Sequence, residues 1–151
     1  SIIFEDIDII SKLSNYVGRQ STVIILDIIK NENTYDIYTH NAGKKINVDL
    51  LKFLKVIQGM GAGEIVVNSI DRDGSMLGYD FDLIDLIYDN TEIPITVIGG
   101  AKDYNDIKKI SLKYGPIGIG AGSIFVYKGS RKAVLINYPN EKEKIELCSP
   151  T

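Results

Sequence analysis

The aspartate at position 27 is the first candidate for chemistry, because it directly follows the apolar run Val23–Leu26. A carboxylate at the end of a buried strand costs free energy unless it is paired or used. Asp27 is therefore a candidate general acid or base. Two alternatives stay open: Asp27 caps a helix or anchors a loop, or it accepts a phosphoryl group as in signalling receiver domains. The receiver alternative needs an acidic pair near the first strand, and this sequence has none there.

Two glycine-containing segments form the second candidate site. Gly99-Gly100 follows the run Ile95–Ile98, and Gly122-Ser123 comes shortly after the run Gly118–Gly120. Glycine lets a ligand approach the backbone because no Cβ atom blocks it. Free N–H groups at the start of a helix, together with a serine hydroxyl, suit a phosphate group. Two such segments after consecutive strands predict a phosphate site; the alternative is that these glycines only form tight turns.

Acidic residues stand on both sides of the run Ile65–Val67. The segment Asp71-Arg72-Asp73-Gly74 follows the run, and its position after a buried strand favours a binding role for at least one aspartate over an ordinary solvated turn. Glu64 precedes the run, so we expect it at the opposite end of the strand, where an acidic residue ordinarily belongs to the surface. His40 lies on a predicted loop, and we expect it to be exposed rather than catalytic.

The pattern of apolar residues predicts the elements that position these candidates. Four runs rich in β-branched residues predict strands, and the first three are continuous, which is typical of strands buried on both faces: Thr22–Leu26, Glu64–Asn68, Ile95–Ile98 and Gly118–Gly120. Between the runs, apolar residues recur at intervals of three and four, which predicts helices within 7–17, 50–57, 83–87 and 107–114. This alternation predicts a single α/β domain over residues 1–151, a parallel sheet of four strands with flanking helices. We also expect a small hairpin through residues 35–39.

Composition excludes several classes of protein. The chain has 151 residues, and its net charge of −3 argues against nucleic acid or an anionic membrane as the main partner. One cysteine allows no intrachain disulfide and indicates a reducing compartment, so we expect a cytoplasmic protein. One histidine cannot build a histidine-rich metal site, and we expect neither a metal nor a cofactor. No apolar run approaches the roughly 20 residues that span a bilayer.

The segment from Gly61 to Gly74, followed by Gly78-Tyr79-Asp80, closely resembles the cyclase subunit of imidazole glycerol phosphate synthase, the HisF family. Ile98–Ala101 and Ala121–Ser123 match the same family in order and spacing. The resemblance implies a (β/α)₈ TIM barrel, of which this chain corresponds to the C-terminal half-barrel, strands five to eight. The correspondence to a C-terminal half agrees with a sequence that begins at Ser1 rather than at methionine.

The resemblance also implies roles for the candidate residues. Asp27 corresponds to a catalytic aspartate, a general acid or base in the cyclisation. Glu64 corresponds to one member of a charged ring at the bottom of the barrel, the gate where ammonia from a HisH-like glutaminase partner enters. The residues that bind the phosphorylated small-molecule substrate are then Asp73, Gly74, Gly99, Gly100, Gly122 and Ser123.

Some positions depart from the family pattern. Ile29 stands where the family often has a lysine, Asn47-Val48 replaces the usual Thr-Gly, and Lys102 stands where a small residue is common. The stretch after Ser123 is similar to a HisF-like branch linked to acetamidino sugars of surface polysaccharides. Three hypotheses follow: a histidine-pathway cyclase, ammonia delivery for sugar amidation, or a non-catalytic half-barrel that binds phosphate. In each case we expect a homodimer or a complementary N-terminal half to complete the core.

Overall fold

The computed structural model describes residues 2–32, 34–40, 42–128, 133–136 and 138–148. Its main feature is one six-stranded sheet with the strand order β3-β2-β1-β4-β5-β6. The strands of this sheet are β1 (Val23–Asn31), β2 (Thr34–Thr39), β3 (Lys44–Ile46), β4 (Glu64–Ser69), β5 (Ile95–Ile98) and β6 (Gly118–Ile119). Strands β1, β4, β5 and β6 run parallel, so the four predicted parallel strands are confirmed. The sheet is open rather than closed into a barrel.

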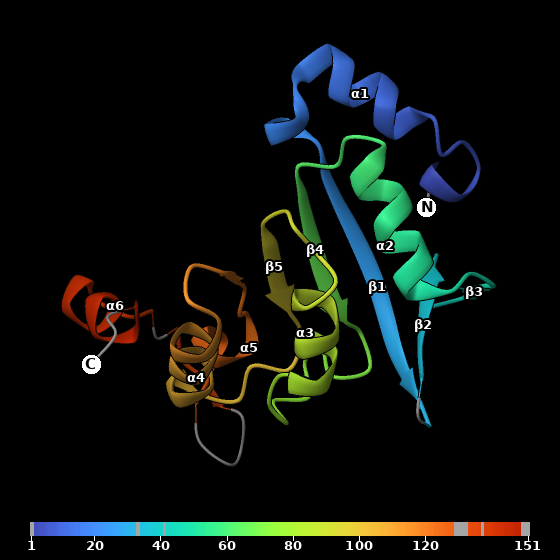
Figure 1. Ribbon diagram of the computed structural model, residues 1–151. Helices are drawn as coiled ribbons and strands as arrows, with labels where there is room; N and C mark the ends of the chain where they lie inside the picture. Colours follow the sequence, from blue (N-terminus) through green and yellow to red (C-terminus); the bar gives the residue numbers. More distant parts are fainter. Residues whose placement is uncertain (1, 33, 41, 129–132, 137, 149–151) are drawn as a thin grey trace.

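Four helices occupy the predicted connections: α1 (Ile9–Val17), α2 (Leu50–Gly59), α3 (Phe81–Tyr88) and α4 (Tyr104–Tyr114). Helices α2 and α3 lie on the same side of the sheet, and α1 lies near the end where β1 begins (Figure 1). Aspartate side chains start three of the helices, because each accepts a hydrogen bond from a backbone N–H of the first turn: Asp49 on α2, Asp80 on α3 and Asp103 on α4. These caps fix where the loops end and the helices begin.

Strand β1 is longer than the sequence predicts. Residues 27–31 pair antiparallel with residues 34–38 of β2, and β2 pairs with β3. The expected hairpin around residues 35–39 is therefore present, but it extends the sheet beyond β1. Asp27 consequently lies in the middle of β1 and not directly after its end, which corrects the prediction. The cause is the antiparallel partner, which keeps the chain extended after Leu26.

Burial alternates along β1 and β4, whereas their continuous apolar runs predict burial on both faces. On β1, Ile24, Leu26 and Ile28 are buried against the helices, but Val23 and Ile25 are 45% and 61% exposed. The prediction of two buried faces is wrong for these strands, because within the described residues helices cover one side of the sheet and leave the other exposed (Figure 1). We call the other side the open face; on β1 and β4 it carries the register pairs Val23–Glu64, Ile25–Val66 and Asp27–Asn68.

The C-terminal region lies beside α4. Helix α5 (Ser123–Val126) is a single turn, the strands β7 (Tyr127–Lys128) and β8 (Ala133–Val134) form a small separate sheet, and α6 (Glu141–Cys148) packs against α4. The ring of Phe125 contacts Tyr104 and Tyr138, with centroids 6.3 and 5.0 Å away. Sequence patterns did not predict β7, β8 or α6.

Candidate functional site

The six residues expected to bind substrate or phosphate line a single small pocket. It lies beyond the carboxyl ends of β4, β5 and β6, and its lining includes Asp73, Gly74, Gly99, Gly100, Gly122 and Ser123, together with Met76, Ala101, Gly120 and Ala121. Most of this lining is glycine or alanine, so the pocket wall is largely backbone. Three loops from three consecutive strands therefore meet at one place, as ligand sites do in parallel α/β folds.

Gly99 and Gly100 are required by the backbone itself. Both have positive φ angles, +92° and +96°. A Cβ atom on Gly99 would lie 2.5 Å from the carbonyl oxygen of Ser69, and one on Gly100 would lie 2.5 Å from that of Gly78. These glycines thus let the loop after β5 pass close to the loop after β4, and this packing holds whether or not a ligand binds.

Gly122 is different, because nothing in its own surroundings requires glycine. A Cβ atom there would meet no heavy atom within 4 Å, and the φ angle of −123° suits any residue. Gly122 precedes the single turn α5, whose first residue is Ser123. Free space in front of this glycine is the arrangement that a ligand needs when it approaches backbone N–H groups.

Tyr79 ties the loop after β4 to the loop after β6. Its hydroxyl donates a hydrogen bond of 2.7 Å to the carbonyl oxygen of Gly120, and the neighbouring Gly78 N–H donates one of 2.8 Å to the carbonyl oxygen of Gly100. Burial raises the pKa of Tyr79, and the negative charge of Asp106 raises it further, so the hydroxyl stays protonated as a donor. Gly78-Tyr79-Asp80 belongs to the segment that resembles the HisF family, but the sequence indicates no individual role for these residues.

Asp27 lies on the open face at the same end of the sheet as the pocket. The side-chain Nδ2 of Asn68 donates a hydrogen bond of 2.8 Å to Asp27 Oδ1. The Asn68 Oδ1 atom in turn lies 3.3 Å from the position that a Cβ atom on Gly99 would occupy. Asn68 therefore stands between Asp27 and the glycine loop. The sequence offered one signal for it, a polar residue at the end of a β-branched run.

Glu64 lies at the other end of β4, as expected from its place before the apolar run. Its Oε1 atom accepts a hydrogen bond of 2.6 Å from the hydroxyl of Thr96 on β5. Both residues are half-buried on the open face. The open face of β4 therefore has a polar pair at each end, Asn68 with Asp27 and Glu64 with Thr96, and Val66 lies between them.

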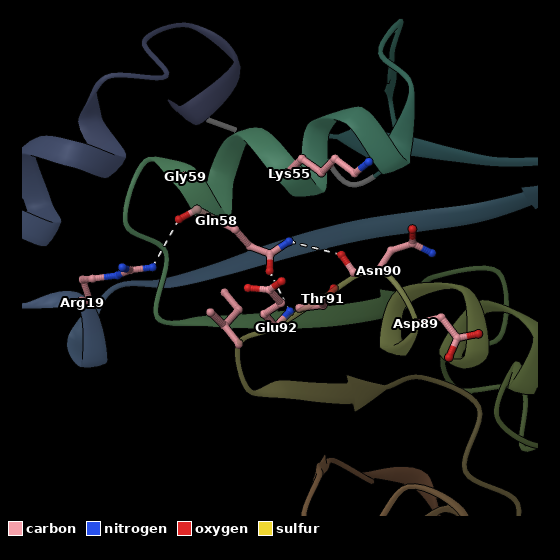
Figure 2. A pocket seen from close by; sticks show the side chains of 9 residues that line it. Arg19, Lys55, Gln58, Gly59, Asp89, Asn90, Thr91 and Glu92 are labelled. Carbon is pink, nitrogen blue, oxygen red and sulfur yellow. Dashed lines mark hydrogen bonds between the residues drawn. The ribbon is translucent and has the colours of Figure 1, made fainter.

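A larger cavity of about 520 Å³ has none of these candidates in its lining, and Figure 2 shows the side chains that line it. Gln58 is at its centre: its Oε1 accepts from the Glu92 N–H at 2.8 Å, and its Nε2 donates to the carbonyl oxygen of Asn90 at 3.3 Å. The cavity is lined by the end of α2 and by residues 89–93, which precede β5, so it lies toward the amino ends of the strands. No candidate residue lines it, and its size alone indicates no chemistry.

A family model described as "Histidine biosynthesis protein" matches residues 1–132. The chain belongs to this family. Its parallel strands and flanking helices agree with the barrel fold expected for the histidine biosynthesis family, although the sheet formed by this chain is open.

Curated relatives match across most of the chain. A Vibrio vulnificus protein named "Putative imidazole glycerol phosphate synthase subunit hisF3" is 47% identical over 146 residues, which are 95% of this chain and 56% of that protein. A Leptospira borgpetersenii protein named "Putative imidazole glycerol phosphate synthase subunit HisF" is 45% identical over 95% of this chain and 58% of its own length. The "Imidazole glycerol phosphate synthase subunit HisF" of Natranaerobius thermophilus is 33% identical over 89% of this chain and 54% of its own length. The chain spans about half the length of the curated relatives it matches.

None of the helices in the described part of the chain is long and apolar enough to cross a membrane. Within the same residues, no group of three or more histidine, cysteine, aspartate or glutamate side chains is arranged to hold a metal ion. His40 is exposed, as expected, and its Nδ1 atom lies 2.9 Å from the hydroxyl oxygen of Thr39.

Proposed function

We propose that this chain forms the phosphate-binding and proton-transferring half of a HisF-like cyclase. The observation that carries the proposal is the single pocket lined by Asp73, Gly74, Gly99, Gly100, Gly122 and Ser123, with Asp27 at the same end of the sheet. A phosphate anchor and a carboxylate at the same end of a parallel sheet suit a phosphorylated substrate that needs proton transfer.

Asp27 is the proposed general acid or base. Because Asn68 donates to Oδ1, that oxygen is held in one orientation and Oδ2 is left for the substrate. A proton-transferring group must lie within hydrogen-bond reach of the atom it serves. Asp27 therefore needs a fixed orientation, and its place in the middle of β1, paired with Tyr38 and Asn68, provides a rigid base for it.

The open face supports the proposal that residues 1–151 act as a half-barrel. Val23 and Ile25 leave apolar surface uncovered on that face, and the curated relatives are nearly twice as long as the matched region. Burial of such a surface is favourable, so a complementary N-terminal half or a second copy of this chain should cover it. The resemblance to the HisF family also implies a second catalytic aspartate and a second phosphate site in the first half of the barrel, and both would come from that covering half.

Glu64 is proposed as part of an ammonia gate at the opposite end of the strands. The hydrogen bond from Thr96 holds its carboxylate against the sheet rather than in solvent. A glutaminase of the HisH type would bind at this end and release ammonia there. Ammonia would then pass along the open face, between Glu64 and Asp27, once that face is covered.

A second candidate function is ammonia delivery for the synthesis of acetamidino sugars. One observation favours it: this chain is 47% identical to the Vibrio vulnificus protein whose name ends in "subunit hisF3", but 33% identical to the Natranaerobius thermophilus protein named as subunit HisF. The stretch after Ser123, which is similar to the HisF-like branch linked to acetamidino sugars, points to the same candidate. The phosphate pocket and Asp27 would serve both reactions.

An activity assay tests the proposal. The chain is mixed with a separately produced N-terminal half of a HisF relative, and the cyclase substrate, a phosphorylated ribulosyl aminoimidazole carboxamide, is supplied with ammonium salt. We expect negligible turnover by the chain alone and measurable turnover by the mixture. Binding of phosphate without any turnover in the mixture would instead support the sugar pathway or a non-catalytic half-barrel, and robust turnover by the chain alone would contradict the half-barrel proposal.

A further inference from the structure

The side chain of Arg72, near the start of the loop after β4, contacts the end of that loop and the neighbouring loop after β5. Its Nη1 atom donates to the carbonyl oxygens of Gly78 at 3.1 Å and of Tyr79 at 3.4 Å. Its Cβ atom lies 3.0 Å from the position that a Cβ atom on Gly100 would occupy. Arg72 therefore spans the loop from its beginning to its end and packs against the loop after β5.

The buried carboxylate of Asp80 is the second part of this arrangement. Asp80 is 3% exposed, and its Oδ1 atom accepts from the backbone N–H of Leu83 at 3.2 Å and from the hydroxyl of Tyr35 at 3.1 Å. Its Oδ2 atom is buried without a hydrogen bond, and the Arg72 Nε atom lies 3.6 Å away from it. Burying an unpaired charge costs free energy. The positive charge of Arg72 offsets part of that cost for Asp80.

Tyr35 brings a distant part of the chain to the same point. It lies on β2, three residues before Tyr38, which pairs with Asp27 in the β1–β2 register. Burial raises the pKa of Tyr35 first, and the negative charge of Asp80 raises it further, so the hydroxyl remains a donor to Asp80 at neutral pH. Tyr35 does not line the pocket. Its hydroxyl therefore influences the pocket through the hydrogen bond to Asp80 and not by lining it.

We propose that Tyr35, Asp80 and Arg72 form a positioning unit that holds the loop of residues 70–78 against the loop after β5 and thereby shapes the anion pocket. The unit links the β1–β2 hairpin, which carries Asp27, to the loop that carries Asp73 and Gly74. None of its three members lines the pocket. The effect of the positioning unit on anion binding rests on the proposed function, whereas its effect on the position of the loop does not.

Hydrogen exchange tests the hold on the loop directly. The reporter is the Gly78 amide, which donates to the Gly100 carbonyl oxygen, and the Ile65 amide of the central strand is the internal reference. In Tyr35→Phe and Arg72→Ala we expect Gly78 to exchange about five to thirty times faster relative to Ile65, because each variant removes hydrogen bonds of the unit. The matched control is Tyr16→Phe, since Tyr16 is 89% exposed and its exchange pattern should equal that of the unaltered chain.

Titration with inorganic phosphate provides the second measurement. If the unaltered chain binds phosphate, we expect both variants to bind it about three to ten times more weakly and Tyr16→Phe to bind it equally well. Arg72→Lys should recover part of the loss, because it restores a positive charge near Asp80 but lacks the second nitrogen that lets the guanidinium face Asp80 through Nε while Nη1 bonds the carbonyl oxygens.

The outcomes separate the two proposals. Unchanged Gly78 exchange in Tyr35→Phe overturns the positioning unit, and this variant decides the matter even if Arg72→Ala fails to fold. Faster Gly78 exchange with unchanged phosphate affinity also overturns the assigned role in shaping the pocket. If the unaltered chain binds no phosphate, the proposed anion site fails, while faster exchange at Gly78 still supports the unit's hold on the loop.

Discussion

The Nδ2 atom of Asn68 donates a 2.8 Å hydrogen bond to Oδ1 of Asp27, across the parallel pair β1–β4. This bond fixes the direction in which the carboxylate presents its free oxygen. Side-chain hydrogen bonds of this kind contribute about 1 kcal/mol to folding. Their larger effect is expected on catalysis, where a small error in geometry reduces the rate strongly.

Replacing Asn68 by leucine keeps the branched shape of the side chain and removes the donor. We expect turnover with ammonium salt in the reconstituted mixture to fall by about 10- to 100-fold, because Asp27 is no longer oriented. The free energy of unfolding should change by only about 1 kcal/mol. Thr96→Val is the matched control, since it removes the hydrogen bond to Glu64 at the other end of the sheet and should leave ammonium-dependent turnover intact. Equal losses in the two variants would contradict the role of Asn68.

Replacing Gly122 by valine tests the anion pocket without disturbing the fold. The new Cβ atom meets nothing within 4 Å, so the melting temperature should stay close to that of the unaltered chain, while phosphate binding should be lost. Gly59→Val is the matched control, because Gly59 also faces open space but lies at the end of α2, away from the pocket. Phosphate binding that survives Gly122→Val, measured by calorimetric titration, would count against the pocket. Gly100 is unsuitable for this test, since any side chain there strains the backbone.

Lowering the pH should destabilise the hairpin of β1, β2 and β3, because it protonates the carboxylate of Asp36. The Lys45 ammonium, at 2.7 Å, and the Asn31 amide, at 3.1 Å, both donate to Asp36 Oδ2 and hold the pKa of that carboxyl below its usual 3.8. A carboxylate whose pKa is lowered in the folded state stabilises the fold above its unfolded pKa, and the contribution disappears as pH falls through the folded value. Asp36→Asn should therefore lose less stability than the unaltered chain when the pH is lowered below about 4. Urea unfolding at a series of pH values measures this; parallel curves for both proteins would contradict it.

The open face should drive association. Ile25 is 61% exposed in the centre of that face, between Val23 and Asp27. We expect the chain to form a dimer, or a complex with a complementary half, and we expect Ile25→Glu to weaken that association because it places a charge in the buried interface. Sedimentation velocity with and without the substitution measures the effect. A monodisperse monomer of the unaltered chain at high micromolar concentration, with a cooperative unfolding transition, would contradict the expectation.

Local patterns predicted the parallel part of this fold, because each run and each helical segment is recognisable from its own residues. They failed where a distant partner decides the structure. The extension of β1 beyond Leu26 depends on pairing with residues 34–38. The apolar run alone predicts a strand that ends at Leu26, with Asp27 after it, whereas Asp27 lies within β1. The one-sided burial of Ile25 depends on which faces helices cover, which a continuous apolar run does not specify.

The site residues also divide into those that the local sequence indicates and those that only the fold identifies. The glycine segments were recognisable because glycines that follow apolar runs allow a close approach to the backbone, and the structure brings them together with Asp73 and Gly74. Asn68, Tyr79 and Arg72 gave no comparable signal, because their partners Asp27, Gly120 and Asp80 are identified only by the fold.

The role of Asp27 is the central claim, and one comparison tests it most directly. Turnover of the phosphorylated cyclase substrate with ammonium salt is measured in the mixture of this chain with an N-terminal half, using the unaltered chain and Asp27→Asn. The amide keeps the shape of the carboxylate and its contact with Asn68 but cannot transfer the proton, so we predict a loss of at least about 10² in rate with phosphate affinity unchanged. Full activity of the Asp27→Asn mixture would contradict the account and place the chemistry elsewhere.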